Sequence, residues 1–220
     1  MQKFDTPAAI SAVVDVPAGR IRFIAADRAD TTVEVLPADA SNNRDVKAAE
    51  QATVGYGDGV LRVETQAKNK YLGSSGSVEV TVQLPAGSRV EAKAASAEFR
   101  TVGRLGDVVF DGSHAALKLD EAASARLTTL DGDVSVGRLG GAAEIRTRRG
   151  DIQIAEAMGG TVVLRTEAGS ISVGAAAGVS ASLDAGATNG RIHNSLKNTG
   201  AADLAIHATT AYGDITARSL

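Results

Sequence analysis

Six copies of one short phrase fill the second half of the chain and limit its possible folds more than any other feature. Each copy is a glycine, then a polar residue, then β-branched residues in alternation: GDVVF from Gly106, GDVSV from Gly132, GDIQI from Gly150, GSISV from Gly169, GRIHN from Gly190 and GDITA from Gly213. Successive glycines lie 26, 18, 19, 21 and 23 residues apart, a period near twenty. One such unit cannot bury its own apolar face, so the repeat predicts units that stack on one another.

A second arm precedes each glycine, and its phase favours a solenoid over stacked hairpins. Leu127, Ile145 and Leu164 each lie five residues before their glycine. Aligned on the glycines, the pairs Val134/Val136, Ile152/Ile154 and Ile171/Val173 form one inward column, because alternate residues of a strand face the same side. We therefore predict an all-β fold with a parallel β-solenoid of about six coils over residues 91–220. Asn194 and Ala217 replace apolar residues of this column, so the final units are expected to form a polar capping coil.

Residues 1–90 are expected to form an irregular β-section, hairpin-like or sandwich-like, packed continuously on the solenoid. Ala12–Val16 and Arg20–Ala25 alternate on either side of Pro17-Ala18-Gly19, which predicts a hairpin. The same Pro-Ala-Gly phrase returns at residues 85–87. Further strands are expected at residues 32–36, 60–64 and 77–84, and residues 38–50 are expected to form a loop with one helical turn.

Composition narrows the function classes. Aromatic residues make up 3% of the chain and Trp is absent, so the core must be built from Val, Ile, Leu and Ala. Without Cys there is no disulfide or thiolate metal site, and a net charge of −3 with mixed signs does not suggest nucleic-acid binding. With no signal-like segment and no run of 18 apolar residues, we expect no membrane span and a cytoplasmic location. A surface location would require export by another route or release from a precursor.

The acidic residues after the repeat glycines, Asp107, Asp133, Asp151 and Asp214, are the most prominent candidate site. Stacked carboxylates could hold cations, but each turn offers a single one, and Ser170 and Arg191 interrupt the column. The favoured interpretation is that each Asp bonds the backbone of its own turn. The repeat glycines and these Asp residues are therefore predicted to be structural, with no metal, cofactor or catalytic residue assigned.

Other candidates are weaker. A column of Arg100, Arg146 and Arg165, joined by Arg148 and Arg149, could form a basic stripe, but the neighbouring residues Glu144, Glu156 and Glu167 favour a solvated mixed-charge face. The three histidines, His114, His193 and His207, are scattered and lack metal-ligand spacing. His207 is expected in the outward column of Arg146 and Arg165, and a triad of His193, Asp184 and Ser195 on adjacent coils lacks any supporting motif. The loop Lys68–Gly76 is basic and Gly/Ser-rich, without a phosphate-binding pattern.

The T-x-x-G-D-[IV]-x-[IV] units and the phrases DVPAG and QLPAGS resemble the bacterial putative-adhesin family of β-strand-repeat proteins, over nearly the whole chain. That resemblance implies a β-solenoid-like fold without known catalytic residues or cofactor. The leading hypothesis is a non-enzymatic protein that binds another macromolecule, a protein or a cell-envelope component, through its outer faces. The alternative is a cytoplasmic scaffold that assembles through its terminal coils, as bactofilin-like solenoids do. An enzyme acting on polysaccharide or ester is a third, weaker hypothesis, and the oligomeric state is left open.

Overall fold

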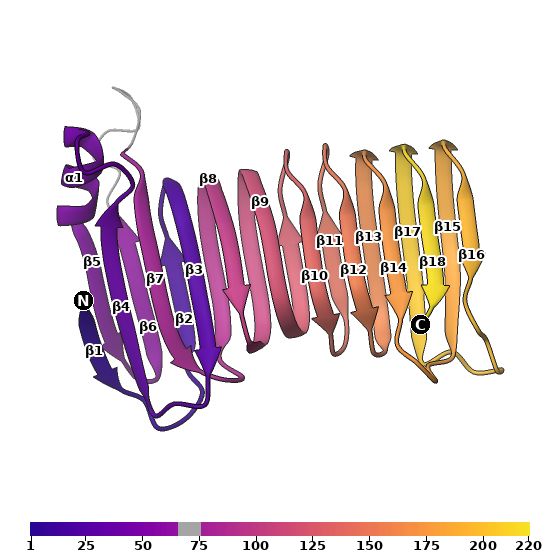
Figure 1. Cartoon of the computed structure of the whole chain (residues 1–220), viewed down its shortest axis with the longest axis horizontal. Helices are drawn as coiled ribbons and strands as arrows, with labels where there is room; N and C mark the ends of the chain where they lie inside the picture. The colour runs from indigo at the N-terminus through magenta and orange to yellow at the C-terminus, as the bar shows by residue number, and fades with distance from the viewer. Residues whose placement is uncertain (66–75) are drawn as a thin grey trace. The chain divides into compact units, whose positions relative to one another are not determined.

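A computed structural model describes residues 1–65 and 76–220 of the chain (Figure 1). These residues form eighteen strands and one helix, and they divide into two compact units, Met1–Ala115 (unit 1) and Ala116–Leu220 (unit 2). The boundary between the units lies inside one long strand, β9 (Arg104–Thr128). The predicted all-β solenoid architecture is confirmed, because most strand pairings in both units are parallel.

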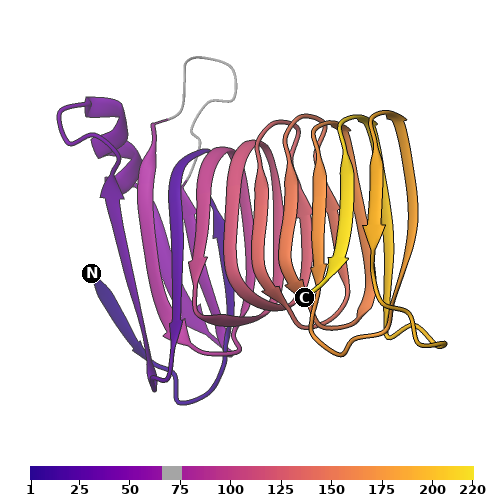
Figure 2. The same cartoon turned by 45° about the vertical axis from the view of Figure 1, so that its right-hand side comes forward.

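Unit 2 is a flattened coil with two walls, each a ladder of parallel strands (Figure 2). The first wall contains, in spatial order, residues 117–122 of β9, then β10 (Val134–Leu139), β12 (Ile152–Ala157), β14 (Ile171–Ala175), β18 (Ile215–Ser219) and β16 (Ile192–Ser195). The second wall contains residues 125–128 of β9, then β11 (Ala143–Arg146), β13 (Gly160–Ala168), β17 (Leu204–Tyr212) and β15 (Ala181–Asn189).

The core of unit 2 lies between the walls and is built from columns of branched side chains. Val134, Ile152 and Ile171 stand opposite one another in register, as predicted, and each is buried. Leu127, Ile145 and Leu164 form an equivalent column in the second wall. Full burial of one such side chain contributes about 1.5–3 kcal/mol, so these columns supply most of the stabilisation that a core without large rings can have.

The last two coils of unit 2 are stacked in the reverse of their chain order. Strands β17 and β18, the last in the chain, lie between the β13/β14 coil and the β15/β16 coil. The polar capping coil is therefore only partly as predicted. Asn194 lies in the outermost strand β16 and is exposed, whereas Ala217 is buried in β18 because strands flank it on both sides.

Unit 1 contains two further parallel ladders. One consists of β6 (Val60–Thr65), β2 (Ser11–Asp15) and residues 89–93 of β8 (Arg89–Val102). The other consists of β7 (Val78–Pro85), β3 (Ala18–Ala26) and residues 96–102 of β8. Three strands extend these ladders in the antiparallel sense: β4 (Asp30–Pro37) on β7, β1 (Gln2–Asp5) on β4, and β5 (Ala52–Gly57) on β6.

The hairpin predicted across Pro17-Ala18-Gly19 is wrong. Strands β2 and β3 do not pair with each other, because each lies between two parallel partners in its own ladder. The turn carries the chain from one ladder to the other. Gly19 has φ +139°, and a Cβ there would lie 1.8 Å from the carbonyl oxygen of Val78, so only glycine fits at this corner. Alternation alone does not distinguish a hairpin from one coil of a solenoid.

Unit 1 also contains the rings of the core and the helix. Phe99 lies 5.9 Å from Phe23 and 5.1 Å from Phe110, measured between ring centroids, and all three are buried. The expected helical turn is a two-turn helix, α1 (Asn43–Glu50), whose N-cap Asn42 accepts a hydrogen bond from the N–H of Arg44. Buried Asp45 of this helix accepts bonds from the backbone N–H groups of Ser77 and Asp39.

Candidate binding surface

The repeat glycines of unit 2 form a stack at one corner between the walls. Gly132, Gly150, Gly169 and Gly213 have φ between +131° and +156°. A Cβ on Gly150, Gly169 or Gly213 would lie 2.3, 2.0 or 2.1 Å from the carbonyl oxygen of the preceding glycine in the stack. On Gly190, in the outermost coil, it would lie 1.8 Å from that of Gly213. The coils therefore approach so closely here that no side chain fits.

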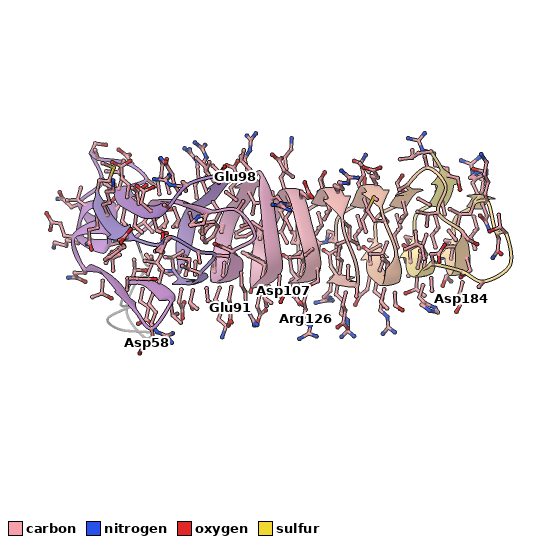
Figure 3. The ribbon with its side chains drawn as sticks, turned by 90° about the horizontal axis from the view of Figure 1, so that it is seen from below. Asp58, Glu91, Glu98, Asp107, Arg126 and Asp184 are labelled. Carbon is pink, nitrogen blue, oxygen red and sulfur yellow. The ribbon has the colours of Figure 1, made fainter. Side chains whose placement is uncertain are left out.

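Gly106 and Asp107 have a different environment from the other repeat phrases. They lie inside strand β9, in unit 1, and not at a corner between strands. Asp107 is exposed on one side of its ladder, as Figure 3 shows. The alternating pattern after Gly106 was recognisable in the sequence, but nothing in the phrase distinguishes a glycine within a strand from a glycine at a turn.

The residue after each glycine links its coil to the next. Oδ1 of Asp133 accepts the N–H of Asp151 at 2.8 Å, and Oδ1 of Asp151 accepts the N–H of Ser170 at 2.7 Å. Oγ of Ser170 accepts the N–H of Asp214 at 3.3 Å, and Oδ1 of Asp214 accepts the N–H of Arg191 at 2.9 Å. The N–H of Arg191, followed by its guanidinium 3.1 Å away, holds the pKa of Asp214 below its ordinary value.

These bonds correct the expectation that each Asp ties the backbone of its own turn. The acceptor of one turn binds the N–H of the neighbouring turn, 18 to 44 residues away in the chain. Ser170 takes part through its hydroxyl, so it continues the column that it was expected to interrupt. Within residues 1–65 and 76–220, no three His, Asp or Glu side chains form a group that could hold a metal ion.

Buried threonines support the same corner from inside. Thr147, Thr166 and Thr210, each three residues before a repeat glycine, donate hydrogen bonds to the carbonyl oxygens of Gly132, Gly150 and Gly169 at 3.4, 3.1 and 2.9 Å. The equivalent residue of the outermost coil is Ala187, opposite Thr210. Each threonine therefore joins its own coil to the preceding one, which explains why the repeat phrase begins with Thr.

Charged side chains on the outward face of the second wall form ion pairs with one another. Glu144 pairs with Arg146 on its own strand and with Arg126 on the neighbouring one, 3.7 Å away. Beyond the wall, Arg148 pairs with Glu167 at 3.4 Å and Arg149 with Asp131 at 3.8 Å. The predicted mixed-charge face is thus confirmed for these arginines. Arg100, in contrast, lies in unit 1, where it stands opposite Arg22.

Arg165 differs from its neighbours on this wall. It stands directly opposite Arg146 in register and is exposed. Among the described residues it has no carboxylate partner, whereas Arg146 pairs with Glu144. Two cations on adjacent strands repel each other, so Arg165 is an uncompensated positive charge on a flat surface. Figure 3 shows Arg126 and Asp184 of the same wall pointing outward on one side of the ribbon.

The histidines do not assemble a catalytic group. Nδ1 of His207 lies 3.2 Å from Oδ2 of Asp184, its cross-strand neighbour in the second wall. His193 and Ser195 lie on β16 in the first wall, and the Ser195 hydroxyl donates to the carbonyl oxygen of Ala217 at 3.5 Å. The hypothetical triad is therefore not formed, because its Asp is paired with a different histidine. His114 is exposed in unit 1.

His207 also lies outside the predicted arginine column. Thr209 is opposite Arg165, and His207 is opposite Val163. The register agrees with the distances to the glycines, because Arg165 and Thr209 each lie four residues before their glycine, whereas His207 lies six residues before Gly213. Of the predicted loop Lys68–Gly76, all but Gly76 lies outside the described residues. No helix in the described part of the chain is long and apolar enough to cross a membrane.

Several solved structures of bacterial proteins are similar to this chain at low sequence identity. A putative adhesin from Bacteroides fragilis NCTC 9343 is similar at 11% identity and a TM-score of 0.47, over 98% of this chain and 95% of that one. A putative adhesin from Parabacteroides distasonis ATCC 8503 is similar at 14% identity and a TM-score of 0.46, with the same coverage. A putative lipid binding protein from the same strain is similar at 10% identity and a TM-score of 0.38, over 98% of this chain and 95% of that one. No curated protein matches the chain.

The Toastrack DUF4097 family matches residues 12–219, a span that covers most of both units and every repeat phrase. The resemblance to bacterial putative-adhesin repeat proteins is thereby confirmed, and this protein belongs to the Toastrack DUF4097 family.

Proposed function

We propose that this protein is a non-enzymatic binding protein that holds another macromolecule, a protein or a cell-envelope component, on the outer surface of the second wall of unit 2. The observation that carries this proposal is the pair Arg146 and Arg165. They are cross-strand neighbours on one sheet, and in the part of the chain that the structure describes only Arg146 of the two has a carboxylate partner. An exposed cation without a partner attracts an acidic group on an approaching molecule and guides its orientation.

The surroundings of Arg165 suit a docking surface. Val163, a half-buried apolar residue, and Thr209 lie beside it, and the pairs Arg126–Glu144 and His207–Asp184 lie farther out. A less polar centre with a charged rim is the usual arrangement of a protein interface. The parallel ladder fixes the backbone positions of these residues, so little backbone entropy is lost when a ligand binds.

Photo-cross-linking in the native cell tests this surface. A photoreactive amino acid placed at Val163 should form adducts with the partner, and the same group at Gln153, exposed on the first wall, should not. Adding Arg165→Glu should reduce the adducts at position 163 by reversing the local charge. Equal adducts from both walls, or none from position 163, would reject the second wall as the binding surface.

Antibody labelling of intact cells separates the two versions of this function. Labelling of unpermeabilised cells supports adhesion to a cell-envelope component, and labelling only after permeabilisation supports a cytoplasmic binding partner. A self-assembling scaffold is the second candidate function. It is favoured by one observation, that β15 and β16 each pair with a neighbouring strand on one side only among the described residues.

A further inference from the structure

The outermost coil of unit 2 is open. Strand β15 pairs with β17 and strand β16 with β18, and no strand among the described residues lies beyond them (Figure 1). Ile192 belongs to the inward column of Ile171 and Ile215, which are each 1% exposed, yet Ile192 itself is 45% exposed. The apolar column therefore ends at an uncovered surface.

This edge lacks several of the features that usually prevent strand pairing, although β16 is only four residues long and β15 carries the outward Asp184. Neither β15 nor β16 contains Pro or Lys, and their inward positions carry no charge. The coil is also held firmly in place, because the chain enters it from β14 and leaves it for β17, a strand of the coil beneath. Only the first residue of β15, Ala181, bonds outside the ladder, to the carbonyl oxygen of Lys197. The rest of the edge is available to another backbone.

The geometry points to a second copy of this chain as the occupant: we infer that two molecules pair through their β15/β16 coils. The uncovered end presents two strand edges separated by the thickness of the core. One added peptide strand would satisfy a single edge and leave the apolar column open. The same coil of another copy has both edges at the same separation, so it can extend both walls and cover Ile192 at once.

A two-fold axis across the walls makes these pairings antiparallel, and the charges of the coil do not oppose that arrangement. Residues 181–203 carry Asp184 and Asp203 against Arg191 and Lys197, which gives no net charge. Arg191 lies at the corner between β15 and β16, and Asp203 lies near the opposite corner, just before β17. Antiparallel pairing places each Arg191, which is paired with Asp214 of its own molecule, beside the corner of the other molecule that carries both Lys197 and Asp203.

The outer strands of unit 1 do not offer a matching end. Strands β1 and β5 are antiparallel to their neighbours, and the rings of Phe4 and Tyr56 meet there with centroids 5.5 Å apart. The inferred assembly is therefore a closed dimer and not a filament. This inference does not rest on the second wall as a ligand surface, since it uses only the strand edges of the terminal coil.

Sedimentation equilibrium of the full chain at high concentration tests the dimer. We expect a species of twice the 22.3 kDa chain mass, and Ile192→Lys should return it to the monomer with an unchanged far-UV spectrum and a melting temperature that no longer depends on protein concentration. Leu130→Lys is the matched control, because Leu130 is 46% exposed at a corner away from the terminal coil, and this variant should remain dimeric. A strictly monomeric wild type, a filament, or a dimer that survives Ile192→Lys would each overturn the inference.

Cysteine cross-linking provides a test that does not depend on the lysine variant. The chain contains no Cys, so a single introduced Cys can form only an intermolecular disulfide. A two-fold axis across β15 places one position opposite itself, and we expect a disulfide-linked dimer from Ser182→Cys, Ala185→Cys or Thr188→Cys. Thr161→Cys on the inner strand β13 should give none. Disulfides from Thr161→Cys alone, or from none of these positions, would place the contact elsewhere or reject it.

Discussion

Oδ1 of Asp151 accepts the backbone N–H of Ser170 at 2.7 Å, across two coils that are neighbours in space. Strands β12 and β14 begin one residue later, with Ile152 opposite Ile171. The Asp side chain therefore adds a hydrogen bond between the two coils at the corner, just before the backbone ladder of β12 and β14 begins. The corner of unit 2 is therefore held by these side-chain bonds and by the threonine bonds to the glycine carbonyl oxygens, in addition to the stacked glycines.

Asp151→Ala should destabilise the protein because it leaves the N–H of Ser170 without this acceptor. We expect the free energy of unfolding to fall by about 1 kcal/mol, the usual net contribution of one hydrogen bond. Asp151→Asn should lose less, since the amide oxygen can still accept. Chemical denaturation measures both. Gln153→Ala, exposed two residues later on the same strand, is the control, and an equal loss there would mean that the bond contributes nothing.

The glycine stack predicts a much larger effect of one methyl group. In Gly150→Ala the new Cβ would lie 2.3 Å from the carbonyl oxygen of Gly132, at φ +139°. Since backbone must move to relieve this overlap, we expect a loss of about 3 kcal/mol or more, or no soluble protein.

Gly178→Ala separates overlap from backbone strain. Gly178 has φ +82°, but nothing lies within 4 Å of an added Cβ. This variant should lose only about 1–2 kcal/mol, the cost of a left-handed conformation for an L-residue. Thermal unfolding of the two variants should rank them clearly, and equal losses would show that close packing of the glycines is unimportant.

Much of the fold could be predicted from the sequence because a solenoid repeats its own local rules. The alternation and the fixed distance from Leu127 to Gly132 and from Ile145 to Gly150 determine which residues face inward, and these columns are found in the structure. The Asp-Gly dipeptide at residues 58–59 was a further signal that sequence reasoning missed. It connects β5 to β6 in an antiparallel hairpin, with Asp58 and Gly59 both at positive φ.

The stacking order could not be predicted, because it depends on which coil lies beside which. Strands β2 and β3 come early in the chain, yet each has parallel partners on both sides. Strands β17 and β18 come last in the chain, yet they lie between the β13/β14 coil and the β15/β16 coil. Local patterns are the same for an inner and an outer coil. The register of β17, in contrast, could be predicted from its distance to Gly213: Arg146 and Arg165 each lie four residues before their glycines and His207 lies six before Gly213, so His207 falls outside their column.

Two buried threonines allow a matched test of the corner hydrogen bonds. The Thr166 hydroxyl donates to the carbonyl oxygen of Gly150 at 3.1 Å, whereas the buried Thr101 hydroxyl has no hydrogen-bond partner among the described residues. Thr166→Val should therefore cost about 1–2 kcal/mol, and Thr101→Val, which has nearly the same shape, should be neutral or stabilising. Denaturation curves measure both, and a larger loss from Thr101→Val would contradict this assignment of the hydrogen bonds.

Asp30 should show the clearest dependence on pH in unit 1. A hydrogen bond from the Arg28 side chain at 2.9 Å, followed by the Lys3 ammonium at 3.1 Å, lowers the pKa of Asp30 from 3.8 to about 2. Because the folded-state pKa is the lower one, the stabilising contribution of the Asp30 carboxylate is complete above the unfolded value. It is lost as the pH falls from about 4 to about 2.

Carboxyl carbon chemical shifts followed by NMR during acid titration measure this directly. Arg28→Met should raise the pKa of Asp30 toward its ordinary value and should flatten the fall in stability in that pH window. The control group is Asp39, whose pKa is lowered by the hydroxyl and then the backbone N–H of Ser41. Arg28→Met should leave Asp39 unchanged, and Ser41→Ala should raise only the pKa of Asp39. A pKa of Asp30 that stays near 2 in Arg28→Met would show that the guanidinium is not its cause.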